Sequence, residues 1–422
     1  MNRKLKGILH LLSTASAALL LTACPRPSGR AYAPAEAESA APDYTFYNRY
    51  HALKVRIAPF RLRQDAETAK TLGTIDALLD RADVIHNGNR VGGYILGPAP
   101  GIDEDNLVTR AERYVEALER GEQPLKGKFT EPGVSLADHS FIIRDGVLHV
   151  FYNRGAIGYD WPERSVETIG HAWTENLTDW TVGPPVLSAQ AGFFEDFAVW
   201  SPSVFEHDGK YHMLYTGVNM HACEALCLAS SDDLYAWTKY GTLPVYIPGD
   251  WGDWDENRWS DCRDPFVFRD GDGTFYLFFC TMVGKGAAAH NAMGIASSTD
   301  LVHWKDEKQF LIEGCDHMPE SPFVIRHGGR YYLFFTNVGR GTAYAVSDSI
   351  LGDWQVRGLL LTVDKLSEDL AHVPSCAEVF EFKGKWYISW CTRLPGNEQY
   401  LELKEFFWRP DGTVSVGRQI GT

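Results

Sequence analysis

Positive charge is scarce in this sequence. Its 422 residues contain 40 Lys and Arg against 55 Asp and Glu, which gives a formal net charge of −15. Because proteins that bind nucleic acid neutralise phosphates with a basic surface, this balance argues against a nucleic-acid partner. The glycine-rich stretch that begins at His86 also lacks the glycine spacing of a phosphate-binding loop, so no nucleotide cofactor is expected.

The N-terminus lacks an apolar run long enough for a comfortable membrane span. After three basic residues, an apolar stretch rich in Leu and Ala ends at Leu21, which is typical of an export signal over residues 1–23. The tetrapeptide LTAC resembles the bacterial lipobox, which implies that Cys24 becomes the lipidated first residue. Residues 24–43 are rich in Pro, Ala and Glu and are expected to form a flexible tether. We therefore expect an exported protein on a bacterial membrane, in the periplasm or on the cell surface, whose only tie to the membrane is this lipid anchor.

The cysteines do not form a metal-binding pattern. The chain has eight cysteines, so seven remain beyond Cys24, and an odd number cannot all pair within one chain. Cys223 and Cys227 lack a second pair at metal-site spacing, so no zinc site is predicted. We expect buried thiols, or one or two disulfide bridges, which export would permit.

Helix-length periodic segments are missing from residues 131–422. In their place a β-hairpin pattern occurs five times: an apolar run, a tight polar turn with glycine, and an aromatic-rich alternating run. The five hairpins begin at Ser140, Ser203, Phe266, Phe323 and Glu378. A second repeated element, a polar turn closed by tryptophan, ends at Trp180, Trp237, Trp304 and Trp354. A repeat of roughly 50 to 65 residues with four short strands predicts an all-β, five-bladed β-propeller over residues 131–422.

Residues 44–130 precede the repeats and have a different pattern. Segments 66–83 and 105–120 have the composition and spacing of helices. We expect a small, partly helical N-terminal extension that packs against the propeller or shapes the rim of its pocket.

The first strand of each propeller blade lines the central axis, so equivalent residues of these strands converge in space. We place these axial positions at Asp138, Ser201 with Pro202, Asp264, Glu320 and Cys376. Three of the five carry carboxylates, which are costly to bring together unless a task requires them. The alternative is that each acid caps a strand or pairs with a neighbour such as Arg263. Two or three carboxylates in a cleft meet the chemical requirement of glycosidic bond cleavage, which needs one protonated and one ionised group.

The motifs Ala-Asp-His, Trp-Ser-Pro, Arg-Asp-Pro and Glu-Ser-Pro, in successive repeats, resemble those of the furanosidase superfamily of five-bladed propellers. That superfamily includes glycoside hydrolase families 43, 32, 62 and 68, and the resemblance covers about residues 135–395. It implies that Asp138 is the general base or nucleophile, that Asp264 tunes pKa values and stabilises the transition state, and that Glu320 is the general acid. It implies no required cofactor, although a calcium ion at the axis, with His372 as a candidate ligand, would be consistent with it.

Other side chains near the expected pocket are candidates for sugar binding. Aromatic faces can stack on a sugar ring, and acids, histidines and an arginine can bond its hydroxyls. The candidates are Trp200, Arg263, Glu195, Asp196, His139 and His317. For the aromatic residue the alternative is packing of a blade edge, and for the polar residues it is a solvated loop position.

Together these patterns predict a glycoside hydrolase that cleaves furanosyl or pentosyl linkages (arabinofuranosyl, xylosyl or fructosyl) in oligosaccharides or polysaccharides. A non-catalytic, sugar-binding propeller is an alternative that requires only the pocket. A related glycosyl transferase or phosphorylase is a third reading. A phosphorylase needs a basic cluster for phosphate near the acid, and around Glu320 only Arg326 and Arg330 are present, in a hairpin turn.

Overall fold

The computed structural model describes residues 45–87, 102–159, 166, 168–312, 319–362, 364–367, 370–394 and 398–420. The chain divides into two compact units, Met1–Tyr44 and Thr45–Thr422, and every described residue belongs to the second. The predicted export signal, the tether and Cys24 therefore lie outside the described residues. None of the described helices is long and apolar enough to cross a membrane.

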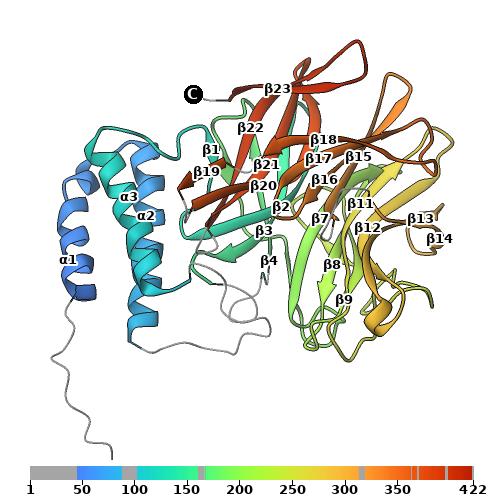
Figure 1. The fold of residues 1–422 in the computed structure, drawn as a ribbon, viewed down its shortest axis with the longest axis horizontal. Coiled ribbons are helices and arrows are strands. Elements are labelled where there is room, and N and C mark those ends of the chain that lie inside the picture. The colour runs from blue at the N-terminus through green and yellow to red at the C-terminus, as the bar shows by residue number, and fades with distance from the viewer. Residues whose placement is uncertain are drawn as a thin grey trace, which may run out of the picture. The chain divides into compact units, whose positions relative to one another are not determined.

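Helices precede the strands and lie side by side in Figure 1. They are α1 (Thr45–Ile57), the short 3-10 helix η1 (Phe60–Leu62), α2 (Ala66–His86) and α3 (Glu104–Glu119). The last two start where an aspartate caps the first turn: the Asp65 carboxylate accepts from the Thr68 amide at 2.7 Å, and Asp103 accepts from Asn106 at 2.8 Å. The helix α1 was not expected, because only Phe46, Leu53 and Ile57 of its residues are fully buried and its apolar pattern is correspondingly weak.

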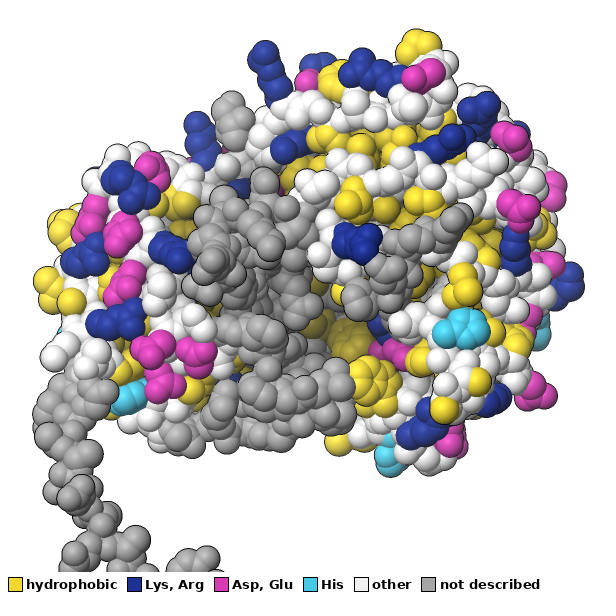
Figure 2. Space-filling view, in the orientation of Figure 1, with side chains coloured by type: hydrophobic (Ala, Val, Ile, Leu, Met, Phe, Trp, Pro, Cys, Tyr) yellow, Lys and Arg dark blue, Asp and Glu magenta, His cyan; other side chains and the backbone are white. Residues whose placement is uncertain are grey.

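An apolar cluster joins the helices to one another and to the propeller. It includes Leu78 and Leu79 of α2 and Val115 of α3, and it continues into Leu394 and Tyr400 of the last blade. Acidic and basic side chains mix on the outer surface of the helices (Figure 2), as in the pairs Arg49 with Glu112 and Arg56 with Glu119. Exposed pairs of this kind each contribute about 0–1 kcal/mol, so the apolar cluster accounts for most of the attachment.

From Lys128 onward, the described strands form five antiparallel sheets, which are the blades of a β-propeller. Blade one contains β2 (Val134–Arg144), β3 (Val147–Ala156), β4 (Thr168–Thr174), β5 (Thr181–Val182) and β6 (Leu187–Ser188). Blade two contains β7 (Ala198–His207), β8 (Lys210–Val218), β9 (Glu224–Ser231) and β10 (Thr238–Lys239). Blade three contains β11 (Cys262–Arg269), β12 (Phe275–Val283), η2 (Gly286–Ala288), β13 (His290–Ser298) and β14 (Lys305–Phe310). Blade four contains β15 (Pro319–His327), β16 (Arg330–Asn337), β17 (Gly341–Ser347) and β18 (Gln355–Thr362).

Blade five closes the ring. It contains β19 (Asp364–Ser367), β20 (Leu370–Phe382), β21 (Lys385–Leu394), β22 (Glu398–Trp408) and β23 (Val414–Gln419). The short N-terminal strand β1 (Lys128–Phe129) joins this sheet by pairing with β22. The first strands β2, β7, β11, β15 and β20 contact each other in turn around the axis. The predicted all-β, five-bladed propeller with a helical N-terminal part is thus confirmed.

The local signals that predicted the hairpins act as expected. Four of the five hairpins turn through two residues with positive φ, namely Asp145-Gly146, Asp208-Gly209, Gly328-Gly329 and Lys383-Gly384. These are type I′ turns, whose twist matches that of paired strands. The tryptophan-closed turns of blades two and three are alike. In blade two the Ser231 hydroxyl accepts from the Leu234 amide at 2.9 Å, and the Trp237 indole donates to the Leu234 carbonyl at 2.9 Å. In blade three Ser298 and Trp304 make the same contacts with Leu301 at 3.0 Å. The described cysteines are buried free thiols.

A buried histidine pair in blade one makes the fold sensitive to acid. His149 and His171 are both buried, with Nδ1 of one 3.0 Å from Nε2 of the other. Burial lowers the pKa of His149 to about 4 and that of His171 to about 3. Below the ordinary pKa of about 6.5, the unfolded chain therefore binds more protons than the folded chain.

We predict that the free energy of unfolding falls as the pH drops from about 6.5 towards 4, with each buried histidine contributing up to about 1.4 kcal/mol per pH unit. The substitution His171→Gln should reduce the difference between urea-unfolding free energies measured at pH 7 and pH 5. His221→Gln, at an exposed position, is the matched control and should leave that difference unchanged. An equal loss on acidification in His171→Gln and the unsubstituted protein would contradict the assignment.

Candidate active site

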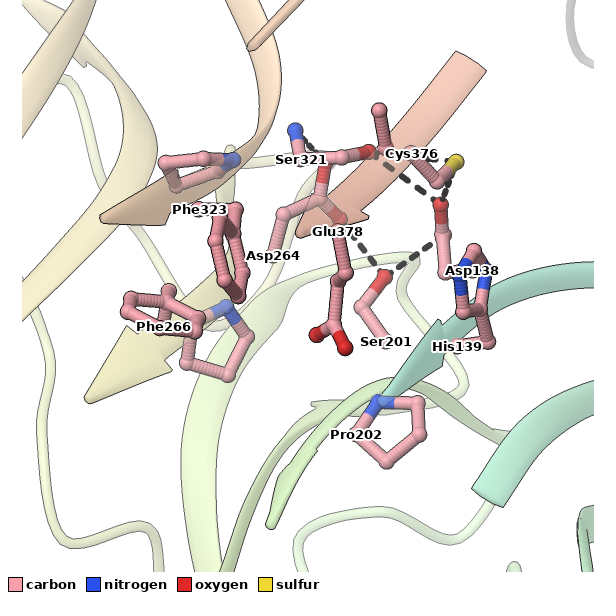
Figure 3. Close-up of a pocket in the computed structure, with 13 residues that line it drawn as sticks. Asp138, His139, Ser201, Pro202, Asp264, Phe266, Ser321, Phe323, Cys376 and Glu378 are labelled. Atoms are coloured by element: carbon pink, nitrogen blue, oxygen red, sulfur yellow. Dashed lines mark hydrogen bonds between the residues drawn. The ribbon is translucent and has the colours of Figure 1, made fainter. Parts of the chain in front are cut away.

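The first strand of every blade is interrupted at the same point. A β-bulge shifts the register between Ala137 and His139 in blade one and at the equivalent step of each later blade. The bulges place five residues around the axis, here called the ring residues: Asp138, Ser201, Asp264, Ser321 and Cys376 (Figure 3). The last four have φ between 47° and 57°, which is uncommon for residues other than glycine. The bulge re-aims the side chain that it contains, so all five converge.

One axial position differs from its prediction. Glu320 was expected at the axis of blade four, but Ser321 lies there, and Glu320 pairs with Thr336 just before the bulge. Aligning Trp-Ser-Pro, Arg-Asp-Pro and Glu-Ser-Pro by their prolines would have shown this, because it matches Ser321 with Asp264 and Glu320 with Arg263. Glu320 was expected there because it carries a carboxylate, whereas the register of the repeat points to Ser321.

Asp138 is surrounded by hydrogen-bond donors. Its Oδ2 accepts from the Asn153 amide at 3.0 Å and lies 2.7 Å from the Ser201 hydroxyl. Its Oδ1 accepts from the Ser321 hydroxyl at 3.1 Å and from the Cys376 thiol. Donors at both oxygens provide the environment that an ionised carboxylate requires.

The surroundings of Asp264 disfavour its ionised form. Its residue is only 6% exposed, and burial, followed by the negative charge of Asp138, raises its pKa. Ser201 Oγ lies 2.7 Å from Oδ1 of Asp264, the same distance as from Asp138. A hydroxyl has a single proton and can donate to only one of the two. The second contact therefore needs a proton on a carboxyl group, and the raised pKa of Asp264 favours that residue as its carrier. The Ser201 hydroxyl therefore bridges the two aspartates.

Arg263 joins the ring to Glu320. Its Nη2 donates to Oε1 of Glu320 at 2.9 Å, and its Nη1 donates to Glu224 at 3.2 Å and to Asp261. Although burial disfavours its charge, the carboxylates around Arg263 raise its pKa. The Glu320 side chain remains 34% exposed, so it can be reached from solvent. Glu224, on the third strand of blade two, was not anticipated, and burial raises its pKa to about 8.

A cavity of about 30 Å³ lies at the axis beside the ring residues, roughly enough for two water molecules. The aromatic side chains of Phe266 and Phe323 and the carboxyl group of Glu378 also line it (Figure 3). Glu378 is buried, accepts from the Phe141 amide at 2.9 Å, and has its pKa raised to about 8 by burial. Sequence reasoning missed this residue, although an acid in the apolar run that follows Cys376 was a visible signal.

Two of the expected sugar-binding residues are enclosed by the protein. Glu195 is 2% exposed and is held by the Tyr215 hydroxyl and the Lys239 ammonium, each at 2.8 Å. His139 is buried and bonded to Ser389 at 2.7 Å, and burial lowers its pKa to about 3. His139 reaches the small axial cavity, but neither side chain faces solvent where a sugar would arrive. In the structure both side chains contact neighbouring strands, and their role in substrate binding stays a prediction.

Of the remaining candidates for sugar or metal binding, some side chains are described in the structure and others are not. Trp200 is half-buried directly before Ser201, and Asp196 is exposed, with Oδ1 accepting from the Met220 amide at 2.9 Å. His317 lies outside the described residues, as does the side chain of His372 in β20. Among the described residues, no group of three or more His, Cys, Asp or Glu side chains is arranged to hold a metal ion. Axial calcium remains an expectation of the resemblance, and no chemical step is assigned to it.

Known proteins share both the sequence pattern and the fold. A β-xylosidase of Xylanibacter ruminicola is 22% identical over 341 residues, which cover 69% of this chain and 99% of the relative. A xylosidase/arabinosidase of Bacteroides ovatus is 22% identical over 333 residues, covering 68% and 96%. The crystal structure of a thermostable family-43 glycoside hydrolase shares the fold, with a TM-score of 0.56 and 18% identity over 68% of this chain and 95% of that one.

The family described as glycosyl hydrolases family 43 matches residues 169–414. The match begins after Asp138 and includes Asp264 and Glu320. It favours the hydrolase reading over a sugar-binding propeller or a transferase. Because it spans more than half of a chain that also has the five-bladed fold, this protein belongs to glycosyl hydrolases family 43 and is a glycoside hydrolase.

Proposed function

We propose that this glycoside hydrolase cleaves pentosyl or furanosyl linkages, xylosyl or arabinofuranosyl among them, in oligosaccharides or polysaccharides. The observation that carries the proposal is the pair Asp138 and Asp264 at the axis, bridged by Ser201, with Glu320 held next to Asp264 by a hydrogen bond from Arg263. The printed names of the relatives, a β-xylosidase and a xylosidase/arabinosidase, support the class of sugar.

In the proposed reaction the three acids divide the work of glycoside cleavage. Glu320 donates a proton to the departing glycosidic oxygen, and Asp138, as a carboxylate, activates water or attacks the anomeric carbon. Asp264 lies beside it, and burial followed by the charge of Asp138 raises the pKa of Asp264, which favours its protonated form. The Ser201 hydroxyl can donate to only one of these two neighbouring carboxyl groups, which favours different ionisation states for them.

Arg263 positions the acid. Its planar guanidinium binds Glu320 on one nitrogen while Glu224 and Asp261 hold another, so the fork geometry fixes the direction of the Glu320 side chain. The positive charge of Arg263 interacts with all three of these acidic side chains and not with Glu320 alone. The exposed fraction of Glu320 lets a substrate oxygen approach it.

The first test measures hydrolysis of aryl xylosides, arabinofuranosides, fructosides and galactofuranosides by the purified protein. We expect the wild type to release one of these sugars. Asp138→Asn should lower kcat by about a hundred- to ten-thousandfold, because the amide keeps the size of the side chain but cannot act as a base. Asp272→Asn, in an exposed hairpin turn, is the matched control and should remain active. Full activity in Asp138→Asn would refute the assignment of the base.

The role of Glu320 predicts a dependence on the leaving group. Glu320→Gln should reduce cleavage of natural oligosaccharides, whose leaving groups need a proton, far more than cleavage of activated aryl glycosides, which leave unaided. Steady-state kinetics on both substrate types will measure the ratio, with Glu122→Gln at an exposed helix end as control. Equal losses on both substrate types would exclude Glu320 as the general acid.

We also propose that the enzyme is exported and anchored through a lipid on Cys24. The basic start, the apolar stretch to Leu21 and the lipobox-like tetrapeptide support this proposal. In a bacterial host the wild type should sediment with membranes, and Cys24→Ser should move to the soluble fraction with its hydrolase activity intact. Membrane association that survives Cys24→Ser would contradict a lipid anchor at this residue.

A further inference from the structure

A second cavity, of about 170 Å³, lies where α3 meets blade five, and none of its lining residues also lines the axial cavity. Basic side chains dominate its polar lining: Arg110 and Arg113 of α3, and Lys128 of β1. Pro124 and Leu394 provide apolar wall. We call this cavity the basic pocket.

The basic pocket arises from the way α3 packs. Arg110, Arg113 and Tyr114 are three and four residues apart, so they share one face of the helix. That face meets blade five, where Glu398 accepts from both Arg110 and the Tyr114 hydroxyl. Lys128 approaches from β1, which pairs with β22 next to Tyr400.

The two carboxylates near the basic pocket, Glu398 and Glu402, already accept hydrogen bonds from other side chains. Glu398 is 2% exposed and uses one oxygen for Arg110 and the other for Tyr114. Glu402, the next carboxylate facing Lys128, accepts from the Thr392 hydroxyl. The basic pocket thus has three cationic side chains and two carboxylates. Its local charge is positive, although the net charge of the whole chain is negative.

Both arginines of the basic pocket keep donor groups that have no acceptor among the described residues. Among the residues that the structure describes, the buried Nε atom of Arg110 has no hydrogen-bond partner, and Arg110 as a residue is only 8% exposed. In the part of the chain that the structure describes, Arg113 is exposed and has neither an ion pair nor a hydrogen bond. The Lys128 ammonium donates to the Tyr400 hydroxyl at 3.0 Å, and burial lowers its pKa. A buried donor without an acceptor is costly, and a bound anion would satisfy it.

We infer that the basic pocket binds the carboxylate of an acidic sugar, with Arg113 and Lys128 as the principal anion contacts. Guanidinium groups match the geometry of carboxylate and phosphate alike. A sugar acid is favoured over a bare inorganic ion because Pro124 and Leu394 offer apolar wall that a sugar ring would cover. The volume, below the roughly 300 Å³ of a drug-sized site, suits a single sugar ring.

The choice of a sugar as ligand rests on the proposed function, whereas the anion site itself does not. In a polysaccharide hydrolase, such a subsite would hold a uronic acid substituent of the substrate at a point separate from the ring residues. It would let the enzyme select acidic chains even though its own net charge is negative.

The test is isothermal titration of the full chain, in phosphate-free buffer, with D-glucuronate, with D-glucose as its uncharged counterpart, and with inorganic phosphate. D-Glucuronate should bind, D-glucose should not, and Arg113→Gln should weaken D-glucuronate binding by about tenfold or more. Arg120→Gln, at the end of the same helix and paired with Glu122, is the matched control and should bind as the wild type does.

Each outcome decides one part of the inference. No D-glucuronate binding to the wild type, or equal binding in Arg113→Gln, would overturn the site. Phosphate bound as tightly as D-glucuronate would overturn sugar recognition. Asp138→Asn should bind D-glucuronate unchanged, and a loss there would place the anion at the axis instead. Because binding is measured without turnover, failure of the hydrolase assignment would not affect these results.

Discussion

Two carboxyl groups meet a single serine hydroxyl at the centre of this propeller, and the organisation of the site follows from that contact. Ser201 can satisfy both Asp138 and Asp264 only if one of them keeps a proton. Burial and the charge of Asp138 raise the pKa of Asp264, which favours Asp264 as the carrier of that proton. The donors around Asp138 are the other half of the same arrangement, since they stabilise the charge that remains.

This arrangement depends on a backbone bulge that occurs in the first strand of every blade. The side chain at the bulge is not the same in every blade. Each first strand bulges at the same step, and four of the ring residues take a positive φ there. The repeat therefore supplies five positions that point at the axis, and the residue type at each position decides its role. Two carry carboxylates, two carry hydroxyls, and one carries the Cys376 thiol. Hydroxyls and a thiol between the acids provide donors without adding charge, so the acids can lie close together.

The helical extension packs against blade five and covers part of its surface. It buries an apolar face against Leu394 and Tyr400, and it brings Arg110 into contact with Glu398 in the interior. Such a buried pair is costly to break, because each partner would leave the other as an uncompensated charge. The extension is thus bound to blade five by apolar packing and by a specific polar contact, and the basic pocket forms between them.

The sequence alone determined the architecture, because hairpin turns, alternating strands and tryptophan-closed turns are local signals that recur in register. It also identified Asp138 and Asp264 as convergent, since a repeat brings equivalent positions together. The tertiary structure decided what local signals do not encode: that Ser321 rather than Glu320 lies in the ring, that Glu195 is enclosed by Tyr215 and Lys239, and that Glu224 and Glu378 are buried acids near the axis. The physical reason is that burial, ionisation and partner choice depend on neighbours from other blades, which no pattern within one repeat specifies.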